Sequence, residues 1–179
     1  MEAATLPAPT RPAAAGISVV RADLWDREAD QPAAYAAAEA WIAGQTWRGI
    51  ADARGCVLIQ FPSPPVTRLS TGSPPGSGQG PAAGMSWPIR IGVQYQPSRL
   101  RYPLAATRDV VFPWATTPSL KSILEEQQPA LVWQHEAGPA AAEWTGDLVY
   151  GEELILRTAA GSPSTNSSVL LVSSIASSP

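Results

Sequence analysis

The segment from residue 89 to residue 96, Ile-Arg-Ile-Gly-Val-Gln-Tyr-Gln, constrains the fold more than any other part of the chain. Side chains of a strand point alternately to its two faces. Apolar residues occupy every second position here: Ile89, Ile91, Val93 and Tyr95. The pattern predicts a strand with one buried and one polar face, which is typical of antiparallel or mixed sheets.

Six further segments have the apolar content or the alternation of strands. They are residues 17–25, 55–61, 109–114, 130–135, 148–157 and 169–175. The segment 55–61 is apolar at nearly every position, so we expect it to be covered on both faces. Residues 160–168 are rich in Gly, Ser, Pro and Asn, and we expect them to form a hairpin loop between the last two strands.

Two segments favour helices. Residues 32–47 are rich in Ala, the best helix former, and Asp30 is a good N-cap candidate. On this helix Trp41 would face the core. A shorter helix is expected at residues 118–128. Its apolar stripe would consist of Leu120, Ile123 and Leu124. The predicted fold class is therefore α+β and mainly β, a small antiparallel or mixed sheet, sandwich or barrel of about seven strands.

Two stretches lack the large apolar side chains that a folded core requires. Residues 1–16 consist mostly of Ala, Pro and Thr, which predicts an extended arm. Residues 62–86 are rich in Pro, Gly and Ser, which predicts a flexible loop inside a single domain at residues 17–179. The arm is either a simple tail or a segment that becomes ordered on a neighbouring protein, and we expect the same ordering for residues 70–84.

Charge is distributed unevenly along the chain. Residues 53–108 contain six arginines and no Asp or Glu, a net charge of +6. Residues 109–179 contain eight acidic and two basic residues, a net charge of −6. Such asymmetry predicts an attraction within the chain or between neighbouring copies. Charged residues make up only 15% of the chain, so the surface is either covered by other chains or kept wet by neutral polar residues.

The chain has no sequence signature of an enzyme or a cofactor site. It lacks a Walker loop and a Gly-x-Ser-x-Gly motif, and the glycine-rich run at residues 76–80 has no strand leading into it. His135 is the only histidine, and its neighbour Glu136 would point to the opposite face of a strand. We therefore expect His135 to be structural, and we predict no catalytic residue, no cofactor and no small-molecule ligand.

Metal binding and nucleic-acid binding are not indicated either. Four carboxylates lie close together at residues 23–30, but without the order of an EF-hand, so we expect a solvated turn. The net charge of −3 and the pI of about 5.1 argue against general binding of nucleic acid. Cys56 is the single cysteine and is expected to be a small, inert apolar residue.

The expected location of the protein rests on two features that the sequence lacks. No apolar run approaches the roughly 20 residues that span a bilayer, so we expect no membrane segment. The N-terminus has neither the basic region nor the apolar core of a signal peptide. We expect the protein to stay in the cytoplasm in which it is made, unless it leaves as part of a virion.

These features favour a non-enzymatic structural subunit that contacts copies of itself, for example in a head-to-tail ring, and neighbouring structural proteins. The hypothesis is a phage virion component: a capsid decoration, neck, tail or baseplate protein. The expected interface residues are Arg90, Arg99, Arg101, Tyr102, Arg108, Trp87, Trp114, Glu125, Glu126, Glu152 and Glu153. One alternative is a carbohydrate- or peptide-binding β module that uses exposed Trp and Tyr side chains, with Trp87 and Trp114 as the best candidates for exposure. The other is an enzyme whose site is assembled from distant carboxylates.

Overall fold

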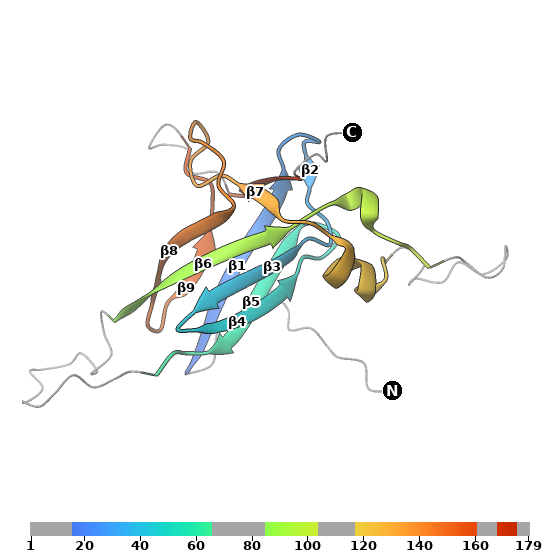
Figure 1. The fold of residues 1–179 in the computed structure, drawn as a ribbon. Coiled ribbons are helices and arrows are strands. Elements are labelled where there is room, and N and C mark those ends of the chain that lie inside the picture. The colour runs from blue at the N-terminus through green and yellow to red at the C-terminus, as the bar shows by residue number, and fades with distance from the viewer. Residues whose placement is uncertain (1–15, 66–84, 104–116, 161–167, 175–179) are drawn as a thin grey trace, which may run out of the picture.

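The computed structural model of the protein describes residues 16–65, 85–103, 117–160 and 168–174. These residues form ten strands in two sheets and only short helical turns (Figure 1). The mainly β prediction is confirmed, although there are ten strands where about seven were expected. The predicted arm apart from Gly16, most of the predicted 62–86 loop and the predicted strand at 109–114 lie outside the described residues.

The six-stranded sheet is built around one long strand. Its members are β1 (Ile17–Asp26), β2 (Gln31–Pro32), β5 (Cys56–Pro62), β7 (Ala130–Val132), β9 (Glu153–Leu156) and β10 (Leu170–Ser174). Strand β5 runs antiparallel to β1, whereas β9 and β10 run parallel to successive parts of it. The sheet is therefore mixed. The predicted hairpin between the last two strands is wrong, because β9 and β10 pair with β1 and not with each other.

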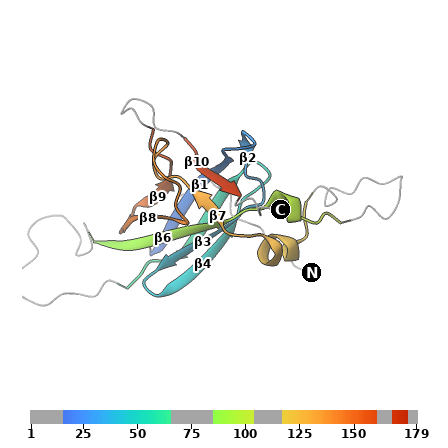
Figure 2. The same ribbon diagram turned by 45° about the horizontal axis from the view of Figure 1, so that its top comes forward.

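The second sheet is entirely antiparallel. Its order is β4 (Gln45–Ile50), β3 (Ala37–Ile42), β6 (Ser86–Gln94) and β8 (Glu143–Val149). Figures 1 and 2 show these strands lying across β1 and β5, so that the two sheets form two layers. One apolar core joins the layers. It contains the four alternating residues of the 89–96 segment, which are each at most 2% exposed, as the sequence predicts.

The Ala-rich helix expected at residues 32–47 is wrong, because this segment is a β-hairpin. Ala43 and Gly44 both have positive φ angles, 49° and 76°, as a two-residue type I′ turn requires. Ile42 and Gln45 are paired across this turn. The alanines alternate between the faces of β3, and Ala38 and Ala40 enter the core. Here burial in a sheet outweighs the intrinsic helix preference of alanine.

Three smaller expectations also fail in part. The predicted helix at 118–128 is a short helical turn of π type, η3 (Ser122–Glu126), and Leu120 from its predicted apolar stripe is exposed. The expected strand at 148–157 is divided by a turn at Gly151 between β8 and β9. The expected strand at 130–135 ends at Val132, so His135 lies beyond it and is exposed.

Candidate functional site

The most distinctive feature outside the two sheets is a polar corner that projects between β6 and β7. We define the corner as residues 97–103 and 117–128, which include η1 (Pro97–Arg99) and η3. Figure 1 shows both turns together to one side of the sheets. The corner brings together two basic and two acidic residues that the sequence singled out separately.

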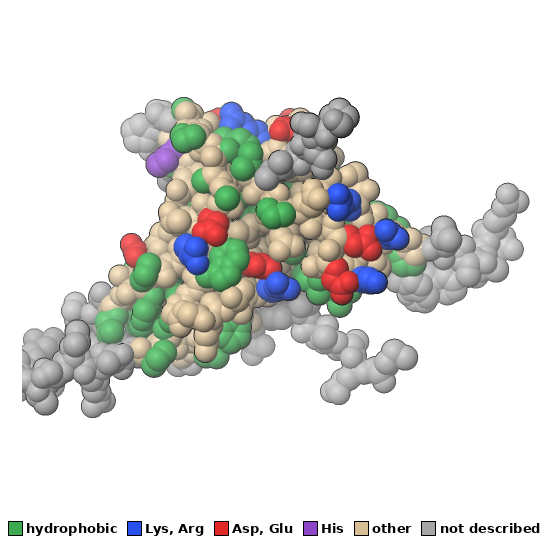
Figure 3. Space-filling model, viewed as in Figure 1, with side chains coloured by type: hydrophobic (Ala, Val, Ile, Leu, Met, Phe, Trp, Pro, Cys, Tyr) green, Lys and Arg blue, Asp and Glu red, His purple; other side chains and the backbone are tan. Residues whose placement is uncertain are grey.

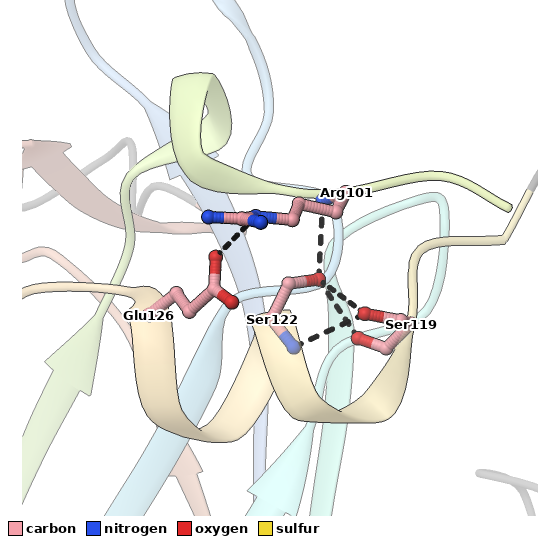
Figure 4. A network of polar contacts seen from close by, with 4 residues as sticks. All are labelled: Arg101, Ser119, Ser122 and Glu126. Atoms are coloured by element: carbon pink, nitrogen blue, oxygen red, sulfur yellow. Dashed lines mark hydrogen bonds and ion pairs between the residues drawn. The ribbon is translucent and has the colours of Figure 1, made fainter.

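A network of hydrogen bonds holds the two halves of the corner together (Figure 4). The Ser119 N–H donates to the Arg101 carbonyl at 2.8 Å, and the Arg101 N–H donates to Ser122 Oγ at 3.1 Å. Ser122 is fully buried, and its hydroxyl donates to the Ser119 carbonyl at 2.8 Å. The Arg101 guanidinium reaches Glu126, with Nε 2.7 Å from a carboxylate oxygen. The corner is thus fixed by its own backbone and side chains.

Gln127 attaches the corner to the sheets. The residue is 7% exposed, and its side-chain amide donates to the Tyr35 carbonyl at 2.8 Å and to the Ile123 carbonyl at 3.1 Å. Its side-chain oxygen accepts a hydrogen bond from the Gln96 N–H at 3.1 Å. Buried amides are stable only when their donors and acceptors are used in this way. The corner is therefore a rigid extension of the core.

A shallow hollow of about 440 Å³ opens on the corner. Its lining residues are Ser98, Arg99, Leu100, Arg101, Glu125 and Glu126. Four of these are interface residues expected from the sequence. Pockets for small organic ligands are mostly apolar, whereas this one is lined mainly by charged and polar side chains. Its composition fits a protein contact better than a small-molecule site.

Two large apolar side chains are exposed on the corner. Tyr102 is 48% exposed and Leu120 is 61% exposed. Each follows directly after one of the two residues, Arg101 and Ser119, that are hydrogen-bonded through their backbones. Figure 3 shows Lys, Arg, Asp and Glu side chains gathered over this part of the molecule. The corner thus exposes two apolar side chains, Tyr102 and Leu120, among charged ones.

The other expected interface residues are dispersed. Arg90 lies on the outer face of the four-stranded sheet, and Trp87 is partly buried against the core, with its ring centroid 6.2 Å from that of Tyr150. Glu153 forms an ion pair with Arg21 across β9 and β1. The exposed Glu152 precedes β9. Arg108 and Trp114 lie outside the described residues.

Part of the predicted attraction between the basic middle and the acidic end occurs inside the chain. Arg90 Nη1 lies 3.3 Å from a Glu143 carboxylate oxygen, and Arg101 pairs with Glu126. A third arginine of the middle segment, Arg54, lies 3.7 Å from Asp52. Charge asymmetry alone therefore does not require a second copy of the chain.

The single cysteine is held in an unreactive form. Cys56 lies beside Asp23, and hydrogen bonding to that carboxylate, followed by burial, raises the pKa of the thiol to about 11. Because the thiolate is the nucleophile, the raised pKa suppresses reaction at neutral pH. Over the described ranges, no group of three or more His, Cys, Asp or Glu is placed to hold a metal ion.

The sequence interpretation missed the outer face of the four-stranded sheet. Trp41 was expected in the core, but it lies on this face and is partly exposed, next to Gly92 and Arg90. The sequence does contain a pattern that identifies this face, because Glu39 and Trp41 alternate with the buried Ala38. The pattern is informative only when the segment is read as a strand. The same correction places Glu39 on the outer face.

No helix among the residues that the structure describes is long and apolar enough to cross a membrane. Searches with the chain against protein-family models, curated protein sequences and solved structures find no match in any of the three.

Proposed function

We propose that the protein is a non-enzymatic assembly subunit that binds copies of itself, and neighbouring structural proteins, through the corner. The observation that carries the proposal is the exposure of Tyr102 and Leu120 on either side of one hydrogen-bonded junction. Scattered exposed apolar residues are normal on a protein surface. Two large ones on a small projecting element, however, are typical of an interface centre.

The residue types on the corner support the same conclusion. Tyr and Arg are enriched among the residues that contribute most to protein binding, and a charged rim commonly surrounds them. Burying a leucine side chain stabilises a contact by about 1.5–3 kcal/mol. The hydrogen bonds of Ser122 and Gln127 hold the backbone of the corner in place before binding, which reduces the entropy lost on association.

Within this class we infer a virion component: a phage capsid decoration, neck, tail or baseplate protein. The support is the combination of a small β core with long stretches of Ala, Pro, Gly and Ser at residues 1–16 and 62–86. Such stretches suit subunits whose peripheral segments become ordered on neighbours. Contacts between unlike surfaces, repeated head to tail, close into rings or tubes.

The test of assembly is the molar mass measured by light scattering over a range of protein concentrations and at low and high salt. The wild-type mass should rise above 18.8 kDa with concentration. The double variant Tyr102→Ser, Leu120→Ser should remain a monomer. Ile155→Ser is the matched control, because Ile155 is 48% exposed on β9 and away from the corner. A wild-type protein of 18.8 kDa under all conditions would contradict self-assembly.

The virion assignment has a separate test. The protein should sediment with purified particles in a density gradient, in an amount that the double variant reduces. Its absence from such particles would contradict the virion assignment, even if the light-scattering result supports assembly.

A further inference from the structure

The outer face of the four-stranded sheet carries a second surface that assembly through the corner does not explain. We define the Trp41 face as Glu39, Trp41, Arg48, Arg90, Gln94 and Glu143. Cross-strand pairing places Trp41 opposite Arg90, and Gly92 opposite both Glu39 and Glu143. This face points toward the viewer in Figure 3, where apolar side chains lie between basic (blue) and acidic (red) side chains over β3 and β6.

The indole of Trp41 packs against the backbone of β6 at Gly92. A methyl group added at Gly92 would lie 2.7 Å from Cη2 and 2.9 Å from Cζ3 of the indole, so the ring occupies the space left by the missing side chain. The Arg90 guanidinium carbon lies 5.7 Å from the ring centroid. Trp41 remains partly exposed although its strand neighbours Ala40 and Ile42 are buried. The indole is thus held in place between Gly92 and the Arg90 guanidinium, and it stays partly exposed on the outer face of the sheet.

The polar groups around the ring are fixed by pairing. Glu39 is only 8% exposed; its Oε1 accepts a hydrogen bond from Gln94 Nε2 at 3.1 Å and forms an ion pair with Arg48 Nη2 at 2.7 Å. Glu143 accepts from Arg90 Nη1 at 3.3 Å. Two carboxylates and two guanidinium groups give the face a net charge of zero. The indole is therefore surrounded by hydrogen-bond donors and acceptors that are fixed in orientation, and the positive and negative charges around it cancel.

We propose that the Trp41 face binds a neutral pyranose unit of a glycan. The C–H side of a sugar ring is apolar and flat enough to stack on an indole, while its hydroxyls point outward in the ring plane and both donate and accept hydrogen bonds. The paired carboxylates, guanidinium groups and amide of this face match those hydroxyls. Phosphate-bearing ligands need an excess of positive charge, which the face lacks.

The test is binding of the full chain to an array of neutral, sialylated and sulfated glycans, followed by calorimetric titration of the tightest neutral binder. Wild-type protein should bind at least one neutral glycan. Trp41→Leu, which keeps an apolar side chain at this position but removes the aromatic ring, should weaken binding about tenfold or more. Ile155→Ala, an exposed apolar residue on the other sheet, should bind as wild type does.

A second readout does not depend on the stability of the variant. In the wild-type protein the glycan should shift the indole N–H resonance that is missing from the spectrum of Trp41→Leu. Binding of acidic glycans alone, binding of no glycan, or unchanged affinity of Trp41→Leu would each overturn the proposal. A changed molar mass of Trp41→Leu without glycan binding would also overturn it, and would identify the face as a protein contact.

Discussion

The Trp41 indole fills the space above Gly92, and the two residues lie on neighbouring strands β3 and β6. Aromatic side chains that cover a glycine on an adjacent strand shield its backbone and stabilise the pairing of the strands. The same contact keeps the ring in one orientation on the open face of the sheet. Both the stability of β6 and the proposed glycan site therefore depend on this pair.

Gly92→Ala should destabilise the protein by about 1 kcal/mol, because the new methyl group displaces the Trp41 ring. In a Trp41→Leu background the same change should be neutral or slightly stabilising, since alanine in a strand loses less entropy than glycine on folding. Urea unfolding of the four proteins in a double-mutant cycle measures this coupling. Equal effects of Gly92→Ala in both backgrounds would show that the indole does not rest on Gly92.

Ser122→Ala should loosen the corner. The substitution leaves the Arg101 N–H without its acceptor and removes the hydroxyl that donates to Ser119, at a cost of about 1–3 kcal/mol. Faster hydrogen exchange at the amides of Arg101 and Ser119 would report the loss. Ser98→Ala, at an exposed position in the same hollow, is the control and should leave the exchange rates unchanged.

Ala43→Asn should stabilise the protein by about 0.5–1 kcal/mol. Ala43 has a φ of 49°, a conformation that asparagine adopts more readily than alanine, and Asn-Gly is the preferred pair for a type I′ turn. The midpoint of urea unfolding should increase with an unchanged slope. Destabilisation would argue that residues 37–50 do not form the hairpin.

Cys56 should react slowly with iodoacetamide at pH 8. With a pKa of about 11 instead of 9.0, the thiolate population is about 100-fold smaller than in the unfolded chain. The folded state holds the proton more tightly, so this group's contribution to stability is present below pH 9 and is lost between pH 9 and pH 11. Asp23→Asn should accelerate alkylation at pH 8, and an unchanged rate would remove Asp23 as the cause.

The part of the fold that could be predicted from sequence is the part with clear alternation. The segment 89–96 has buried apolar residues at every second position, and its residues 89–94 belong to the strand β6. The hairpin at 37–50 was missed because alanine favours helices and its burial in a sheet depends on partners far along the chain. The pairing of β9 and β10 with β1 likewise depends on long-range contacts that local composition does not encode.

The sequence identified most residues of the candidate site, but it did not show how they are arranged in space. The sequence singled out Arg99, Arg101 and Tyr102 as a basic, aromatic cluster and Glu125 and Glu126 as an acidic pair, and the structure brings four of these five into one hollow. What sequence could not show is that the basic and acidic groups meet inside one chain. That contact arises because hydrogen bonds join Arg101, just after η1, to Ser119 and to Ser122, the first residue of η3.

The most direct test of the assembly proposal uses the only lysine of the chain. Lys121 is exposed on the corner, next to Leu120, so an amine-acetylating reagent modifies only Lys121 and the N-terminal amine. We predict that the acetylation rate of Lys121, measured by mass spectrometry, falls at least about fivefold when the protein is concentrated from dilute solution into the assembled state. In the double variant Tyr102→Ser, Leu120→Ser the rate should not change with concentration. An equal rate in dilute and assembled wild-type protein would contradict a contact through the corner.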